Sequence, residues 1–419
     1  MTATRNPTDW KSDAMQRRIA RRYASERRFK MAGLSAVLLS AAFLAFLLIT
    51  MVGNGVRGFT RTEIALNIDF PASPLLLDPQ AITDEALANA NLPMVTSDVA
   101  KKQLGKDADR LLSPTAWIVV RDAIKADPKI LSQTVTISVP ASTGIDLAAK
   151  SNGSPDFEAD YARLNKAGMV HTGINWSFLT ASDGTDPTQV GIWGAFKGSL
   201  ITMLVTLALS FPIGVATALY LEEYAPKAWW TDIIEVSINN LAAVPSIIFG
   251  LLGLSIFLNF LHLPRSAALV GGMTLALMTM PVIVIAGRNA IKSVPPSIRD
   301  AALGIGASPV QVVFHHVLPL ALPGILTGTI IGLAQALGET APLLLIGMVG
   351  YIATNYPEGI AAGFMSPNSA MPAQIYEWAK RADPAYYERA WGGIIILLVF
   401  LLAMNVIAIV LRRKFERRW

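Results

Sequence analysis

The stretch RDAALGIGASPVQVVFHHVLP, residues 299–319, decides the fold because this polar and then amphipathic segment lies between two long apolar segments. Ser297, just before it, can cap the start of a helix, with Asp300 three residues later as in a capping box. The residues Ala301–Leu303 are good helix formers. Gly306 is expected to end this first helix, because glycine readily adopts positive φ.

The second half of the stretch has a helical pattern of its own. Val310, Val313, Phe314 and Val317 recur at spacings of three and four residues, which predicts an amphipathic helix with one apolar stripe. Such a stripe can insert into the groove of a partner protein, or it can lie on its own helix bundle or on the lipid surface. The spacing alone leaves these alternatives open.

The composition indicates a membrane protein. The 419 residues are 53% hydrophobic and 16% charged, and the mean hydropathy of +0.45 is well above that of a soluble chain. The net charge of +5 does not indicate nucleic-acid binding, because the basic residues collect beside apolar segments. There is no cysteine, and the four histidines have no metal-binding spacing, so we expect no metal site.

Six apolar segments are long enough to cross a bilayer, whose hydrocarbon core of about 30 Å requires about 20 helical residues. We expect them at residues 31–52, 200–221, 238–261, 267–286, 320–349 and 392–411. The third is the weakest, because Asn239, Asn240 and Pro245 interrupt it.

The orientation follows from the basic residues at the two ends of the chain. The tail 1–30 and the tail 412–419 are rich in Arg and Lys, which the positive-inside rule places in the cytoplasm. Six crossings satisfy this arrangement and put the loop 288–319 on the cytoplasmic side. The segment 31–53 could instead be a signal peptide. An anchor is favoured, because the apolar run exceeds the usual roughly 7 to 15 residues and no small-residue cleavage site follows.

A polar segment, residues 54–190, separates the first two spans and is too long for an ordinary loop. Alternating apolar and polar residues predict strands at 64–70 and 134–139, and the patterns at 98–112 and 114–126 predict helices. We therefore expect an inserted α+β domain on the periplasmic side. Its acidic and basic residues have no spacing that specifies catalysis.

The fifth span contains Gly324, Gly328 and Gly332, which the four-residue spacing puts on one helix face. This predicts close packing against a neighbouring helix, although the glycines could also merely loosen their own helix. Glu339 and Thr340 follow in an otherwise apolar segment. A charge there costs about 3 kcal/mol, so Glu339 is expected either on a translocation pathway or in a structural ion pair.

The segments expected in the cytoplasm contain no phosphate-binding glycine loop and no nucleophile beside a base. We therefore expect a protein without catalytic residues and without a bound cofactor of its own. Any energy source has to come from another subunit.

Several motifs resemble one family. The spacing of Asp300-Ala301-Ala302, Gly306 and Leu318-Pro319 is similar to the EAA loop of ABC importer permeases. The segment 338–345, GETAPLLL, and the C-terminal segment resemble the PstA family of phosphate importer permeases. Asp300 departs from the usual Glu of this loop, and His316 replaces an aliphatic residue. The stretch from about residue 17 to 174 resembles an N-terminal extension, of unassigned function, in some members.

The resemblance implies an all-α polytopic bundle of the type I importer class, residues 191–411, in a bacterial inner membrane. It implies import of inorganic phosphate with a PstC-like permease, two PstB-like ATPases that bind ATP and Mg, and a PstS-like periplasmic phosphate-binding protein. The residues that would couple to the ATPase are Asp300, Ala301, Ala302, Gly306, Val310, Phe314, Leu318 and Pro319. Those near the pathway or its gate would be Glu339, Thr340 and Arg288.

One further departure concerns Glu339. Many relatives have Arg four positions before this glutamate, one helical turn away, but here the position is Gln335. Glu339 is then expected to pair with the PstC-like subunit or with Arg288. Two other functions stay open from the sequence: a permease for another oxyanion or organic solute, and a membrane sensor or scaffold.

Overall fold

The computed structural model describes residues 12–75, 77, 79, 82–348 and 360–415. The chain divides into two compact units, residues 1–53 and 54–419, which are described separately. Most of the first unit belongs to helix α1 (Asp13–Gly58), which is 46 residues long. At 1.5 Å per residue this is about 70 Å, more than twice the thickness of a hydrocarbon core. The first predicted span is thus helical, and the helix continues through most of the basic tail.

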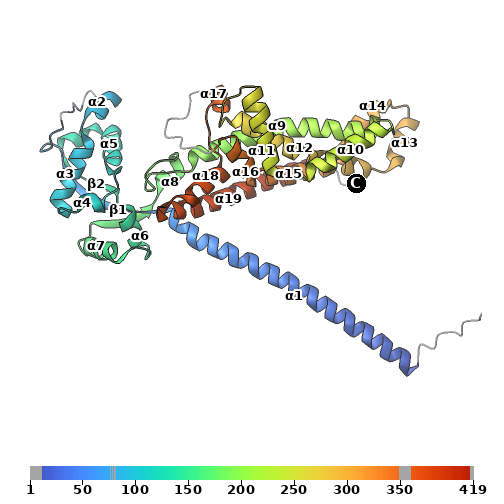
Figure 1. Ribbon diagram of the computed structural model, residues 1–419, viewed down its shortest axis with the longest axis horizontal. Coiled ribbons are helices and arrows are strands. Elements are labelled where there is room, and N and C mark those ends of the chain that lie inside the picture. Colours follow the sequence, from blue (N-terminus) through green and yellow to red (C-terminus); the bar gives the residue numbers. More distant parts are fainter. Residues whose placement is uncertain (1–11, 76, 78, 80–81, 349–359, 416–419) are drawn as a thin grey trace, which may run out of the picture. The chain divides into compact units, whose positions relative to one another are not determined.

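Four long apolar helices of the second unit run side by side: α9 (Trp193–Leu219), α12 (Ala268–Lys292), α15 (Leu318–Gly338) and α19 (Pro384–Phe415) (Figure 1). α12 packs against both α9 and α15, and α15 packs against α19. The described residues contain five helices able to span a membrane, or six if a bent pair counts as one span.

The third predicted span, 238–261, is not one continuous helix. It falls in the bent pair of helices, with the interruption that the sequence indicated at Pro245. α10 (Trp229–Ala242) is followed by α11 (Ser246–Leu252) and the π-helix η3 (Gly253–Phe260), with a bend of 106° between the two parts. Pro245 lies at the break with ψ of 137°. It has no N–H to donate and disfavours helical backbone in the residue before it, which ends α10.

The fifth predicted span is also interrupted. α15 ends at Gly338, Glu339 is extended with ψ of 123°, and the short helix α16 (Ala341–Leu345) follows. One continuous helix over 320–349 is therefore wrong, and its last residue lies outside the described residues. Pro342 explains the interruption, because it cannot continue the preceding helix.

Short helices complete this part of the chain. They are the π-helix η2 (Tyr220–Tyr224), α13 (Pro296–Gly304), α14 (Pro309–Gln311), the π-helix η4 (Val312–Val317), α17 (Ile360–Met365) and α18 (Met371–Lys380). α13, α14 and η4 contain most of the stretch 299–319.

Residues 60–180 form an α+β arrangement with its own hydrophobic core. Its antiparallel sheet has the strand order β2-β1-β3, with β1 (Thr60–Asp69), β2 (Thr134–Pro140) and β3 (Val170–Ile174). Leu66 pairs with Ile137, and Thr62 pairs with Thr172. The helices are α2 (Asp84–Asn89), α3 (Leu92–Leu104), α4 (Ala108–Leu111), α5 (Ala116–Ala126), the 3-10 helix η1 (Pro128–Ser132), α6 (Thr143–Ala149), α7 (Pro155–Lys166) and α8 (Trp176–Thr180).

Both predicted strands are confirmed, since Ile64, Leu66 and Ile68 alternate into the core along β1. The predicted helix over 98–112 is broken instead, because Gly105 ends α3 with φ of 95°. β3 was not predicted. Its sequence VHTGI is short and carries only two apolar residues, so the alternation that identified the other strands is absent.

Candidate functional site

Two prolines position the start of α13. Pro295 is the N-cap residue and Pro296 the first helical residue, and no side chain caps this end. The predicted cap at Ser297 is therefore wrong, because the fixed φ of proline starts the helix earlier and leaves Ser297 inside the first turn. The capping box lies farther along, where Ser308 Oγ accepts from the backbone N–H of Gln311 and Gln311 Oε1 accepts from that of Ser308.

Gly306 ends α13, as predicted, with φ of 88°. Its N–H donates to the carbonyl of Leu303 at 2.9 Å, and the N–H of Ala307 donates to that of Ala302 at 3.1 Å. These two bonds are the Schellman arrangement, which satisfies the last carbonyls of a helix. A residue with a side chain at position 306 would strain this turn.

The inner side of α13 and η4 is buried in a hydrophobic core formed with the adjoining ends of α9, α12 and α15. Ala302, Val313 and Val317 lie in this core. The apolar stripe predicted for this segment therefore does not lie in one environment. Val313 and Val317 are buried, whereas Val310 and Phe314 are about half exposed. η4 is a π-helix, and its wider turn shifts residues away from α-helical spacing.

Four exposed side chains, which we call the apolar face, form the outer side: Leu303, Ile305, Val310 and Phe314. Ile305 is 83% exposed, the largest value of the four. Leu303 and Ile305 were not predicted as exposed residues of this face. Their position beside the helix-ending Gly306 was a signal in the sequence.

The remaining residues predicted to couple occupy different environments. Asp300 and Ala301 are exposed on α13, whereas Ala302 is 4% exposed. Leu318 and Pro319 are partly buried in the first turn of α15. Within the segment 300–319, some residues of the predicted set, such as Ala302, are therefore buried against the membrane helices. Others, such as Asp300 and Phe314, are exposed.

Charged residues connect this segment to the membrane helices. Glu223, on η2 directly after α9, accepts from Arg299 Nη2 at 2.7 Å. Its neighbour Glu222 accepts from Arg288 Nε and lies 3.4 Å from Lys292 Nζ. Arg288 Nη2 also lies 2.7 Å from Glu235 Oε2, on α10.

Of the two partners expected for Glu339, Arg288 is therefore wrong, and the PstC-like subunit stays a prediction. Gly324 of α15 faces Ala290 of α12, so Arg288 lies near the start of α15. Glu339 follows the other end of α15, roughly 20 Å farther along the helix at 1.5 Å per residue.

The three glycines of α15 face α12. A Cβ atom added at Gly324 would lie 2.7 Å from Ala290 Cβ, one at Gly332 would lie 3.0 Å from Thr279 Cγ2, and one at Gly328 would overlap Ala286 Cβ. The close approach of the two helices therefore depends on the absence of side chains at these positions.

The two helices that follow the interruptions, α11 and α16, pack against each other. A Cβ atom added at Gly250 of α11 would lie 2.7 Å from Pro342 Cα, which belongs to α16. Glu339 and Thr340, directly before α16, are partly buried. Within the described part of the chain, Glu339 forms no ion pair. Non-helical backbone at membrane depth is tolerated where protein or a water-filled path covers it, which makes this meeting point the candidate for a pathway.

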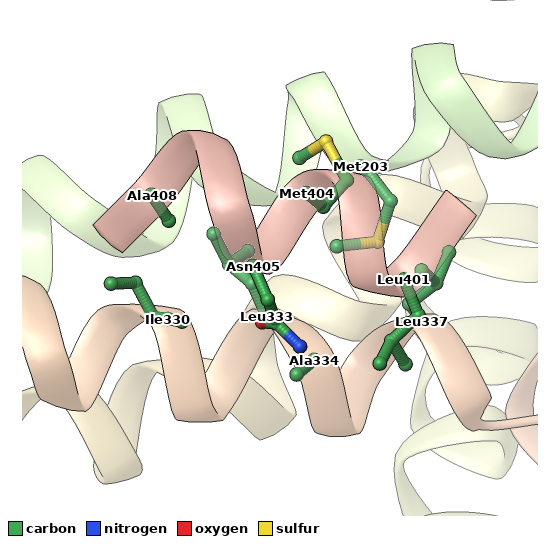
Figure 2. Close-up of a pocket in the computed structure, with 9 residues that line it drawn as sticks. All are labelled: Met203, Ile330, Leu333, Ala334, Leu337, Leu401, Met404, Asn405 and Ala408. Atoms are coloured by element: carbon green, nitrogen blue, oxygen red, sulfur yellow. The ribbon is translucent and has the colours of Figure 1, made fainter. Parts of the chain in front are cut away.

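A small cavity of about 40 Å³ lies between α9, α15 and α19. Asn405 points from α19 toward the turn of α15 that carries Leu333 and Ala334 (Figure 2). The other lining residues are apolar: Met203, Ile330, Leu337, Leu401, Met404 and Ala408. With one amide and no cation, the cavity has no chemistry for an anion. Among the described residues, no group of three side chains could hold a metal ion.

The chain is similar to known proteins in two separate segments. Residues 210–419 match the family described as binding-protein-dependent transport system inner membrane component, and residues 16–159 match a domain of unknown function. The phosphate transport system permease protein PstA 1 of Mycobacterium tuberculosis (strain CDC 1551 / Oshkosh) is 30% identical over 54% of this chain and 72% of its own length. PstA of Haemophilus influenzae is 30% identical over 56% and 79%.

PstA of Yersinia pestis is 27% identical over 54% of this chain and 73% of its own length. Among solved structures, an inward-facing MetNI methionine ABC transporter matches 54% of this chain and 98% of the matched chain, with 18% identity and a TM-score of 0.40.

Proposed function

The chain belongs to the PstA family of phosphate transport system permeases, and we propose that it is a permease subunit through which an ABC importer moves inorganic phosphate across the bacterial inner membrane. The observation that carries this proposal is the 30% identity over 72% of a PstA relative. The bundle of long apolar helices is consistent with it.

We propose that the apolar face docks on a PstB-like ATPase, which binds ATP and Mg. Leu303, Ile305 and Phe314 are each about half exposed or more, on a segment whose inner side is anchored in a core. An anchored segment with an apolar outer side fits the insertion of a short helix into a partner's groove. Contact through residues 300–319 then allows ATP hydrolysis on the ATPase to drive transport through this subunit, in which we found no nucleotide-binding motif.

The other partners are proposed to be a PstC-like permease, a second copy of the ATPase and a PstS-like periplasmic phosphate-binding protein. With six crossings, both basic tails face the cytoplasm together with α13, and residues 54–190 face the periplasm. The bent pair α10 and α11–η3 then counts as one crossing.

The meeting point of α11 and α16 is proposed to border the translocation pathway. Glu339 has extended backbone, and Thr340 is the N-cap residue of α16. A lone carboxylate repels an anion, so gating is the proposed role of Glu339 rather than direct binding of phosphate. For Arg288 the proposed role is structural instead, and its ion pairs with Glu222 of η2 and Glu235 of α10 support this role.

Uptake in cells tests the proposal. Deletion of this chain under phosphate starvation should abolish high-affinity import of radiolabelled phosphate, and complementation should restore it. Sulfate uptake in the same cells is the matched control. Loss of sulfate uptake with intact phosphate uptake would favour an oxyanion permease of different specificity, and unchanged uptake of both would contradict a transport role.

A further inference from the structure

One guanidinium group joins three elements next to the apolar face. Arg299 of α13 donates from Nη1 to the carbonyl of Val294 at 2.7 Å and from Nη2 to the carbonyl of Ile291 at 3.1 Å. The same group holds Glu223 on η2, with Nη2 at 2.7 Å and Nε at 3.2 Å from Oε1. The side chain therefore binds one carbonyl in the last turn of α12, one carbonyl just after that helix, and Glu223 on η2 at the end of α9.

The carboxylate next to Glu223 reaches a different helix. Glu222 accepts from Arg288 of α12, so two consecutive residues of η2 bind α12 and α13 separately. η2 is a π-helix directly continuing α9. The end of α9 is thereby fixed to both elements through charged contacts.

These contacts are poorly accessible to solvent. The side chains of Glu222 and Glu223 are each 11% exposed, that of Arg288 is 10% exposed and that of Arg299 is 23% exposed. Exposed ion pairs between flexible side chains contribute little, but removal of one partner from a desolvated pair leaves an uncompensated charge. The ion pair of Arg299 and Glu223 can therefore fix the orientation of α13, which a fully exposed ion pair could not do.

We propose that Glu223 and Arg299 are positioning residues for energy coupling. They keep α13 in register with α9 and α12, so that a displacement of α13 by the ATPase is passed to both membrane helices. This inference rests on the proposed docking of the apolar face. It goes beyond that docking, because neither residue belongs to the face and both act through α13.

The test uses the complete importer with its ATPase and binding protein. Arg299→Lys retains the positive charge but loses the planar fork that reaches three acceptors, and Glu223→Gln removes the charge with little change in shape. Lys227→Gln is the control, since Lys227 is exposed four residues after Glu223. The measured quantities are the amount of ATPase that copurifies, the rate of ATP hydrolysis and the uptake of inorganic phosphate.

Both variants should retain the ATPase but transport about fivefold less phosphate per ATP hydrolysed, within the usual range of coupling free energies. The control should keep the wild-type ratio. A merely structural defect would lower hydrolysis and uptake together, and an unchanged ratio in both variants would overturn the inference. Loss of the copurifying ATPase in both variants would also overturn it. Ile305→Asp tests the docking of the apolar face separately from the coupling role of Glu223 and Arg299. If this variant binds the ATPase as well as the wild type does, the docking itself is contradicted.

Discussion

Lys150 Nζ lies 3.0 Å from Glu388 Oε2, which joins the C-cap residue of α6 to the first turns of α19. Both side chains are less than 10% exposed. Lys150 also binds Asp146 at 2.7 Å, and Arg389 donates to the carbonyl of Gly58. Asp146 lies in the segment that matches a domain of unknown function, and Glu388 lies in the segment that matches the permease family. The buried ion pairs of Lys150 thus connect residues of the two matched segments.

Another buried ion pair involves Asp183, which lies before α9 and between the two matched segments. It accepts from Trp378 Nε1 at 2.8 Å and lies 2.7 Å from Arg381 Nη2. Burial disfavours the charge on Arg381, but attraction to Asp183 and the hydrogen bond between them outweigh this effect and raise the pKa of Arg381. Arg381 therefore keeps its positive charge at any physiological pH.

Loss of Lys150 should destabilise the protein strongly. Lys150→Ala leaves Glu388 and Asp146 buried without their shared cation, which costs about 3–5 kcal/mol for a buried pair. Thermal unfolding of the purified protein in detergent measures the change. Lys166→Ala, at an exposed position of α7, is the control and should change stability by less than about 0.5 kcal/mol. Equal stability of the two variants would contradict an anchoring role of the charge cluster.

The contact between α12 and α15 predicts a contrast between two glycines of one helix. Gly328→Ala forces a methyl group into Ala286 and should cost about 1–3 kcal/mol through overpacking. Gly338→Ala, where an added Cβ atom meets nothing within 4 Å, should be nearly neutral. Thermal unfolding of both variants under the same conditions measures the difference in stability. A similar loss of stability in both would mean that α12 and α15 do not approach closely at Gly328.

The sequence anticipated the membrane helices and the strands β1 and β2, because long apolar runs and strict alternation are strong local signals. It indicated interruptions at Pro245 and around Glu339. It did not anticipate the bend of 106° at Pro245 or the end of α15 at Gly338, since apolar residues continue on both sides of each break. The Ser297 cap failed because two prolines determined where α13 starts. The Arg288 pairs could not be inferred, as their partners are 66 and 53 residues distant and depend on helix packing.

The apolar face should be required for ATPase binding. Ile305→Asp introduces a charge at the most exposed position of the face and should reduce copurification of the ATPase subunit about tenfold, as expected for a central apolar contact. Lys227→Gln lowers the net charge by the same one unit at an exposed site outside the face, and it should leave copurification unchanged. Retention of the ATPase by Ile305→Asp would remove the face from the interface.

The absence of cysteine allows a direct test of orientation. Lys166→Cys and Gly304→Cys each introduce one thiol at an exposed position, the first on α7 and the second at the end of α13. In cells with a permeable outer membrane, a membrane-impermeant maleimide should label only Lys166→Cys. Gly304→Cys should react only after the inner membrane is opened. The opposite pattern would invert the topology and place α13 out of reach of an ATPase.

Reconstitution tests the central claim most directly. Proteoliposomes that contain this chain, a PstC-like permease and the PstB-like ATPase, supplied with ATP on one side and phosphate-loaded binding protein on the other, should accumulate radiolabelled phosphate. Accumulation should stop when ATP or this chain is omitted, and radiolabelled sulfate should not accumulate. Phosphate accumulation that is undiminished without this chain would contradict its role as a permease subunit.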